Sequence, residues 1–245
     1  MRQKVARNLC RWVRPGGQKG GGGHNGAMHA ERTDAAAAPR LAWVITGVSL
    51  LVAAVGLGAL VTAGGEPSAI DLWWNGVTAD MPEGSVGFGL VMDFIGGGWF
   101  AVFAVPIGGA VLLLLARRVR GALYFLLASV MSAAIVQALK QAFGRARPDD
   151  ILVAADYGSF PSGHTANAAT IAIVLIVLFP RAWAVAVGVA WTLLMALSRT
   201  VLHAHWLSDT LGGALVGAGA AVLLAVVVGM PLVPARDPEP RPPEA

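Results

Sequence analysis

Six apolar stretches constrain the fold of this chain more than any other feature of its sequence. A helix needs about 20 apolar residues to cross a hydrocarbon core of about 30 Å, and each stretch is close to that length or exceeds it. The composition agrees, because 56% of the residues are hydrophobic and 13% are charged, far from the balance of a soluble domain. The sequence therefore predicts an all-α integral membrane protein with six transmembrane helices. The stretches are roughly residues 41–64, 98–116, 121–139, 164–180, 182–199 and 209–233.

The segments outside these stretches differ from them in composition. Residues 1–40 are rich in Gly, Ala and Arg and show no apolar period, which is typical of a disordered tail. They lack the compact apolar core of a signal peptide, so we expect no cleavage there. Residues 234–245 are expected to form a second solvated tail, and residues 65–97 a long loop with room for a short amphipathic helix on the membrane. We therefore expect a six-span domain over residues 41–233 between two flexible tails.

The positive charges indicate how the spans are oriented, because cytoplasmic loops of membrane proteins carry an excess of Lys and Arg. With both termini in the cytoplasm, 14 of the 18 Lys and Arg residues fall on the cytoplasmic side. Lys140, Arg145, Arg147 and Arg199 fall on the other side. We expect a multi-pass protein of the plasma membrane, in which charges that break the rule at the ends of spans need a functional explanation.

Three polar clusters lie at the ends of spans, all on the predicted extracytoplasmic side. Together they offer three cations, two histidines and a carboxylate. Sites that bind a phosphoryl group use several cations to bind the phosphoryl oxygens. The clusters therefore predict a phosphate site at one membrane surface. They consist of Lys140, Arg147 and Pro148, then Pro161 to His164, then Ser198, Arg199, His205 and Asp209.

The second cluster has the features of a helix start that binds an anion. Ser162 precedes an apolar run and is a good N-cap residue, which leaves the next amide hydrogens free. Gly163 has no side chain to keep a phosphate oxygen away from the backbone, so its amide and that of His164 can form part of a cradle. For this motif alone, a plain N-cap followed by a histidine at the membrane surface is an equally good interpretation.

The third cluster contains a histidine and a carboxylate four residues apart. If a helix begins near Trp206, His205 and Asp209 lie about one turn from each other. A carboxylate bonded to one imidazole nitrogen fixes the tautomer and makes the other nitrogen a nucleophile. A structural bond at a helix start would be the simpler explanation if this pair stood alone.

The basic residues of the clusters supply charge without a group that acts as a base near neutral pH. Lys140, Arg147 and Arg199 are therefore interpreted as a clamp for a phosphoryl group, because all three are expected on the side that carries both histidines. Arg145 is expected to be an ordinary anchor at the membrane surface. His203 fits no cluster and is expected to line the pocket or to pack.

The order and spacing of the clusters resemble the type 2 phosphatidic acid phosphatase (PAP2) superfamily, which is shared with vanadium haloperoxidases. The resemblance covers roughly residues 95–230 and implies a six-helix core with an extracytoplasmic site and no metal or other cofactor. It implies that His205 is the nucleophile that forms a phosphohistidine, that Asp209 orients it and that His164 is the general acid. The positions that match the phosphate binders are Lys140, Arg147, Ser162, Gly163 and Arg199.

The resemblance implies a lipid phosphatase that hydrolyses a phosphomonoester or pyrophosphate of the phosphatidate, phosphatidylglycerol phosphate or polyprenyl pyrophosphate class. A lipid phosphotransferase would use the same residues, and a membrane transporter or silent scaffold would bind the anion without turnover. Residues 65–97 are expected to shape selectivity.

The expected partners are a lipid phosphate and the bilayer. Nucleic acid is not expected, because the basic tail has little aromatic interleaving. One cysteine excludes an internal disulfide framework. The GxxxG spacing of Gly213 and Gly217 suits a dimer or close packing within the bundle, and we favour packing, with the oligomeric state left open.

Overall fold

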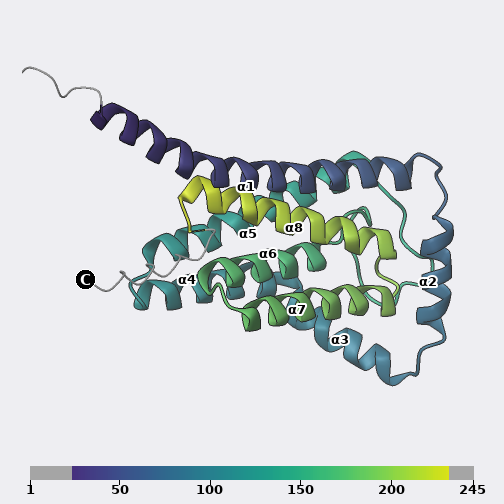
Figure 1. The fold of residues 1–245 in the computed structure, drawn as a ribbon. Coiled ribbons are helices and arrows are strands. Elements are labelled where there is room, and N and C mark those ends of the chain that lie inside the picture. Colours follow the sequence, from purple (N-terminus) through teal and green to yellow (C-terminus); the bar gives the residue numbers. More distant parts are fainter. Residues whose placement is uncertain (1–23, 232–245) are drawn as a thin grey trace, which may run out of the picture. The chain divides into compact units, whose positions relative to one another are not determined.

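The computed structural model describes residues 24–231, in which every regular element is a helix and none is a strand (Figure 1). Contacts divide the chain into residues 1–39 and residues 40–245, and the second unit contains the helical bundle. Residues 24–39, expected within a disordered tail, belong to α1, and the rest of both predicted tails lies outside the described residues. The elements are α1 (His24–Thr62), α2 (Ala69–Ala79), α3 (Gly84–Gly96), the π-helix η1 (Phe100–Ala104), α4 (Val105–Leu115), α5 (Val119–Phe143), α6 (Gly163–Leu178), α7 (Ala182–Val201) and α8 (Leu207–Val228).

Among the described residues, four helices are long and apolar enough to cross a membrane, namely Arg40–Thr62 of α1, α5, α7 and α8. A fifth span results if α3 is joined with η1 and α4, although the two parts are bent by 45° at the break. The chain is therefore an integral membrane protein, but the predicted number of six spans is not confirmed.

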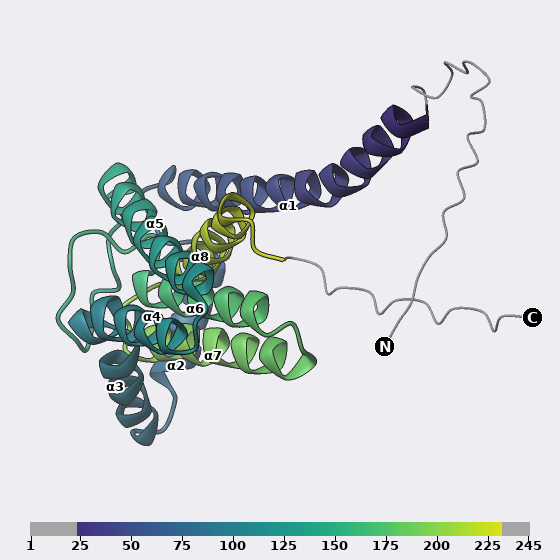
Figure 2. The ribbon, with the colours of Figure 1, turned by 90° about the vertical axis from the view of Figure 1, so that its left-hand side faces the viewer.

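One of the six predicted spans, α6, is shorter than a membrane-spanning helix. It has 16 residues, and 16 residues of helix measure about 24 Å, less than a hydrocarbon core. It ends before Phe179, because the proline at position 180 disfavours a helical conformation for the residue that precedes it. Contacts with α5, α7 and α8 surround α6, which lies in the middle of the bundle in Figure 2.

Glycines on α8 let this helix pack closely against α6. A Cβ atom on Gly213 would lie 2.3 Å from the carbonyl oxygen of Ser162, and one on Gly217 would lie 2.1 Å from that of Ala166. No carbon atom fits at such distances, so a side chain at either position would push the two helices apart. The small-residue face of α8 therefore serves packing within the bundle, which confirms the preferred interpretation, and it brings the start of α6 beside the start of α8.

Four helices meet at one end of the bundle, where α5 and α7 end and α6 and α8 begin. The predicted loop over residues 65–97 covers this end and consists largely of α2 and α3. In Figure 1, α2 runs across the ends of the bundle helices, and it contacts α7 and α8. Its exposed face is apolar, with Trp73 61% exposed, while Asp71 on its inner face is buried. An exposed apolar face with a tryptophan suits the membrane interface.

Candidate active site

A cavity of about 390 Å³ lies where these four helices meet. Six of the eight predicted site residues line it, and they come from α5, the loop that follows, α6, α7 and the turn before α8. The other two, Ser162 and Asp209, are fully buried and do not line it. The lining residues from the prediction are Lys140, Arg147, Gly163, His164, Arg199 and His205.

Ser162 caps the helix that carries His164. Its hydroxyl group accepts a hydrogen bond from the hydroxyl group of Thr165 at 3.2 Å and a longer one from the Thr165 amide at 3.5 Å. Its own amide donates to the carbonyl oxygen of Asp209 at 2.9 Å, which ties the start of α6 to the start of α8. Gly163 and His164 then line the cavity in the first turn of α6, where helical amide hydrogens have no partner within the helix.

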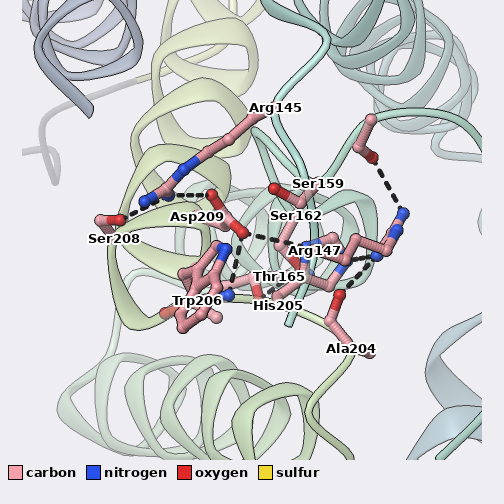
Figure 3. A network of polar contacts seen from close by, with 12 residues as sticks. Arg145, Arg147, Ser159, Ser162, Thr165, Ala204, His205, Trp206, Ser208 and Asp209 are labelled. Carbon is pink, nitrogen blue, oxygen red and sulfur yellow. Dashed lines mark hydrogen bonds and ion pairs between the residues drawn. The ribbon is translucent and has the colours of Figure 1, made fainter. Parts of the chain in front are cut away.

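His205 lies in the turn between α7 and α8, with its two ring nitrogens in different surroundings (Figure 3). Nδ1 is 3.6 Å from Oδ2 of Asp209, which is longer than a hydrogen bond, and Nε2 is 3.3 Å from Nη1 of Arg147. A carboxylate can only accept and a guanidinium can only donate, so this arrangement favours a proton on Nδ1 and a lone pair on Nε2. Burial lowers the pKa of His205 to about 4, although Asp209 opposes the shift. The imidazole is therefore neutral at neutral pH.

Asp209 is held by two donors besides facing His205. Its Oδ2 accepts the backbone N–H of Trp206 at 2.9 Å, which caps the start of α8, and its Oδ1 accepts a hydrogen bond from Arg145 (Figure 3). Both oxygens of the buried carboxylate are thus fixed, and the side chain cannot swing away from the imidazole without breaking one of these bonds.

The prediction that Arg145 is a surface anchor is wrong. Its side chain is only 6% exposed and lies between two buried carboxylates, Asp209 and Asp71, the latter at 2.8 Å. A third bond joins its Nη1 to the hydroxyl group of Ser208 at 2.8 Å. The reason for the burial is the pair of opposite charges, since a buried guanidinium is stable only when it is paired and hydrogen-bonded.

Asp71 reaches this network from α2. Its carboxylate accepts the backbone N–H of Ser208 at 2.9 Å and the hydroxyl group of the same residue at 2.8 Å. Burial would raise the pKa of Asp71, but the hydrogen bonds from Ser208 and Arg145 outweigh it and hold the pKa below its ordinary value. Asp71 is therefore ionised, and its charge balances that of the Arg145 guanidinium.

Two further acids, which sequence reasoning did not assign to the site, pair with its cations. Asp156 accepts Nζ of Lys140 at 2.9 Å and Nη2 of Arg147 at 2.8 Å. Burial opposes the ionisation of Asp156, yet these two cations lower its pKa overall. The sequence gives no reason to single out Asp156, because the loop in which it lies contains several acidic residues in similar surroundings.

Asp93 on α3 is the second of these acids. It forms an ion pair with Arg199, and the same oxygen, Oδ1, lies 3.1 Å from Nε2 of His164. A signal for it exists in the sequence, because it is an isolated acid in the otherwise apolar run over residues 85–99, where an ionisable side chain is expensive without a partner.

Arg199 is almost fully buried at the wall of the cavity, with 1% of its side chain exposed. Within residues 24–231, Nε and Nη2 of its guanidinium have no hydrogen-bond partner. Each such buried donor costs roughly 1–3 kcal/mol. Arg199 lines the cavity, so an anion that comes within reach of its guanidinium would offer these donors a partner.

His203 does not line the cavity. It is buried, with Nδ1 bonded to Asp150 and Nε2 3.5 Å from the hydroxyl group of Thr78 on α2. Of the two interpretations offered by the sequence, the structure supports packing.

Residues 121–231 match the family model of the PAP2 superfamily, and this segment holds all eight predicted site residues. This segment has the sequence pattern of the PAP2 superfamily. Lipid A 1-phosphatases of two organisms are similar to this chain. That of Rhizobium johnstonii is 33% identical over 118 residues, which are 42% of this chain and 46% of the relative. That of Porphyromonas gingivalis is 38% identical over 85 residues, 34% of this chain and 18% of the relative. The matched regions thus cover less than half the length of these relatives.

Two solved structures have a fold similar to that of this chain. The transmembrane PAP2-type phosphatidylglycerolphosphate phosphatase of Bacillus subtilis superposes with a TM-score of 0.61 at 24% identity, over 73% of this chain and 94% of that one. Aquifex aeolicus LpxE superposes with a TM-score of 0.57 at 23% identity, over 65% of this chain and 96% of that one.

Proposed function

We propose that this protein is a PAP2 membrane lipid phosphatase that works through a phosphohistidine at His205. The observation that carries the proposal is that His205 lines the same cavity as Lys140, Arg147 and Arg199, and its low pKa keeps the imidazole neutral. A nucleophile needs an available lone pair, and a phosphoryl group needs cations around its oxygens. The cavity offers both.

In the first step, Nε2 of His205 attacks the phosphorus, and the bond from phosphorus to the leaving oxygen breaks as the bond to nitrogen forms. His164, whose ring lines the same cavity, gives a proton to the leaving oxygen. The three cations and the amides at the start of α6 bind the equatorial oxygens, where charge accumulates in the transition state. The lipid alcohol, or the lipid monophosphate when the substrate is a pyrophosphate, then leaves, and the phosphoryl group stays on His205.

In the second step, a water molecule attacks the phosphorus of the phosphohistidine. His164, now without its proton, accepts one from this water, the bond between nitrogen and phosphorus breaks, and inorganic phosphate leaves. Both histidines return to their starting forms. Asp209 stabilises the positive charge on the imidazole while the phosphoryl group is attached, as its Oδ2 lies on the Nδ1 side of the ring.

The substrate we propose is a lipid phosphomonoester or pyrophosphate whose phosphate reaches the extracytoplasmic surface of the plasma membrane, with both termini of the protein in the cytoplasm. The similarity to lipid A 1-phosphatases makes the 1-phosphate of lipid A the first compound to assay. The phosphatidate, phosphatidylglycerol phosphate and polyprenyl pyrophosphate classes complete the panel.

The test is phosphate release by the purified protein from each of these lipids, with EDTA present throughout. We expect release from at least one lipid by the wild type and none above background by His205→Ala. The proposal fails if no lipid is hydrolysed, if EDTA abolishes release, or if His205→Ala retains activity. Adding lipid alcohols as acceptors separates a hydrolase, which releases free phosphate, from a phosphotransferase, which forms a new ester instead.

A further inference from the structure

A second cavity, of about 370 Å³, adjoins the one described above. The two share three lining residues, Gly96, His164 and Asn167. His164 therefore stands at the junction, with the cations of the site on one side and the second cavity on the other.

The second cavity follows a single face of α6. The lining residues of this helix follow His164 by three, four, seven, eight and eleven positions, which is the pattern of one helical face. The last of them lies eleven positions after His164, so the face reaches about 16 Å from His164 toward the other end of the helix. It consists of His164, Asn167, Ala168, Ile171, Ala172 and Leu175.

The remaining walls of this cavity are apolar. Val187, Trp191 and Met195 of α7 form one of them, and Ile95, Phe100 and Val105 form the other. Besides His164 and the indole N–H of Trp191, the polar group among the described lining residues is the amide of Asn167, which donates to the carbonyl oxygen of Ala101 at 3.3 Å. A cavity that is polar at one end and apolar along the rest of its length fits a ligand that has a polar end and an apolar chain.

Glycines hold the junction between the cavities in its present shape. A Cβ atom on Gly97 would lie 1.9 Å from Nε2 of His164, and one on Gly96 would lie 2.0 Å from the terminal methyl group of Met195. Side chains at these two positions would displace the general acid of the proposed mechanism and a wall of the second cavity.

We propose that the second cavity binds an acyl chain of the substrate, on the side of the leaving group. This inference rests on the proposed function, because His164 protonates the leaving oxygen, so whatever is attached to that oxygen begins at His164. An apolar chain that continues from there meets the face of α6. A chain in the bilayer is already out of water, so the cavity selects by length and shape rather than by hydrophobic free energy.

Two substitutions shorten the cavity by different amounts. Ile171→Trp blocks it about 10 Å from His164, and Leu175→Trp blocks it about 16 Å from His164. Leu193→Trp adds the same bulk to α7 at a position that is 64% exposed and outside the cavity, and serves as the control. Thermal unfolding in the same detergent shows which variants fold. If Ile171→Trp does not fold, Leu175→Trp still tests the proposal.

The first readout is the ratio of kcat/KM for long-chain over short-chain phosphatidates. We expect this ratio to fall roughly tenfold in Ile171→Trp, in line with the selectivity of apolar pockets. In Leu175→Trp, which leaves more of the cavity open, only longer acyl chains should be affected. In Leu193→Trp the ratio should stay at the wild-type value. An equal effect on all chain lengths, or an equal effect in the control, overturns the proposal.

The second readout does not need turnover. Phosphatidate with a photoreactive group at the end of one acyl chain is cross-linked to each variant, and the labelled peptides are mapped by mass spectrometry. We expect label on residues 167–175 and 187–195 of the wild type and its loss in Ile171→Trp or, if that variant does not fold, in Leu175→Trp. Label on these residues without phosphate release from any lipid would refute the proposed function and keep the acyl site. Phosphate release without such label would refute the acyl site alone.

Discussion

Arg145 binds Oδ1 of Asp209, while Oδ2 of the same carboxylate lies on the Nδ1 side of the imidazole of His205. The guanidinium therefore positions the proposed nucleophile through an intermediate residue. Its second partner, Asp71, extends this support to α2, an element outside the segment that matches the PAP2 superfamily.

We predict that Arg145→Met strongly destabilises the protein, because it leaves Asp71 and Asp209 as buried carboxylates without a cation. Loss of one partner from such a cluster costs about 3–5 kcal/mol. The midpoint of unfolding in detergent measures the effect. Arg145→Lys retains the charge but loses the fork geometry, so it should restore most of the stability while kcat stays below that of the wild type. Unchanged stability in Arg145→Met would contradict the assigned role.

The pH dependence of kcat/KM should reflect the low pKa of His205. The free enzyme is active with this imidazole neutral, so activity is lost as pH falls through the pKa of about 4 and not through the ordinary value of 6.5. The coupled pair of histidines gives a bell-shaped profile, with the acid limb below about pH 5. An acid limb centred near the ordinary pKa of 6.5 would show that His205 is not held neutral.

The same shift makes stability depend on pH. The folded protein holds His205 neutral above pH 4, while the unfolded chain takes up this proton below about pH 6.5. The unfolded state therefore binds more protons in this window, and stability falls as pH is lowered from about 6.5 toward about 4. We expect a smaller loss over the same window in His205→Gln, measured by thermal unfolding. Equal losses in both proteins would contradict the assignment.

His164 and Asp93 should affect the reaction according to the leaving group. His164→Asn removes the proposed general acid, so release from a lipid ester should drop by about 10²–10⁴, and release from p-nitrophenyl phosphate, whose leaving group needs no proton, should drop much less. Asp93→Asn should show the same pattern more weakly, because Asp93 contacts His164 and Arg199 from α3. A uniform loss for both substrates would assign the two residues to binding instead.

Close packing of α6 on α8 predicts that Gly217→Ala lowers stability by about 1–3 kcal/mol, since its Cβ would meet the Ala166 carbonyl oxygen at 2.1 Å. Gly56→Ala is the matched control, because a Cβ there has no neighbour within 4 Å. Thermal unfolding of the two variants gives the comparison. Equal midpoints would mean that the helices separate more easily than their contacts indicate.

The sequence predicted the bundle helices and several of the polar residues that line the cavity, because apolar runs mark the helices and the polar clusters lie at their ends. The apolar runs predicted the positions of the bundle helices, and spacing predicted which polar residues meet at one end of them. Six of those residues line one cavity, but their catalytic roles stay predictions. The number of spans was not predictable in this way, because α6 is buried by its neighbours and need not be as long as a lipid-facing helix.

Two of the residues whose roles sequence reasoning missed, Arg145 and Asp93, act through partners distant in the chain. Arg145 looked like a surface anchor until α2 supplied Asp71, 74 residues away. Asp93 pairs with Arg199 across 106 residues. A local pattern can mark one member of such an ion pair, as the isolated acid Asp93 does, but its partner depends on how the helices are arranged in space.

Direct detection of the phosphoenzyme tests the central claim. Wild type and His164→Asn are mixed with p-nitrophenyl phosphate, quenched within one turnover under conditions that preserve phosphohistidine, digested and analysed by mass spectrometry. We predict a phosphoryl group on His205, in larger amount in His164→Asn, which lacks the base for the second step. Turnover without any phosphoryl group on His205, or with one on another residue, would contradict the mechanism.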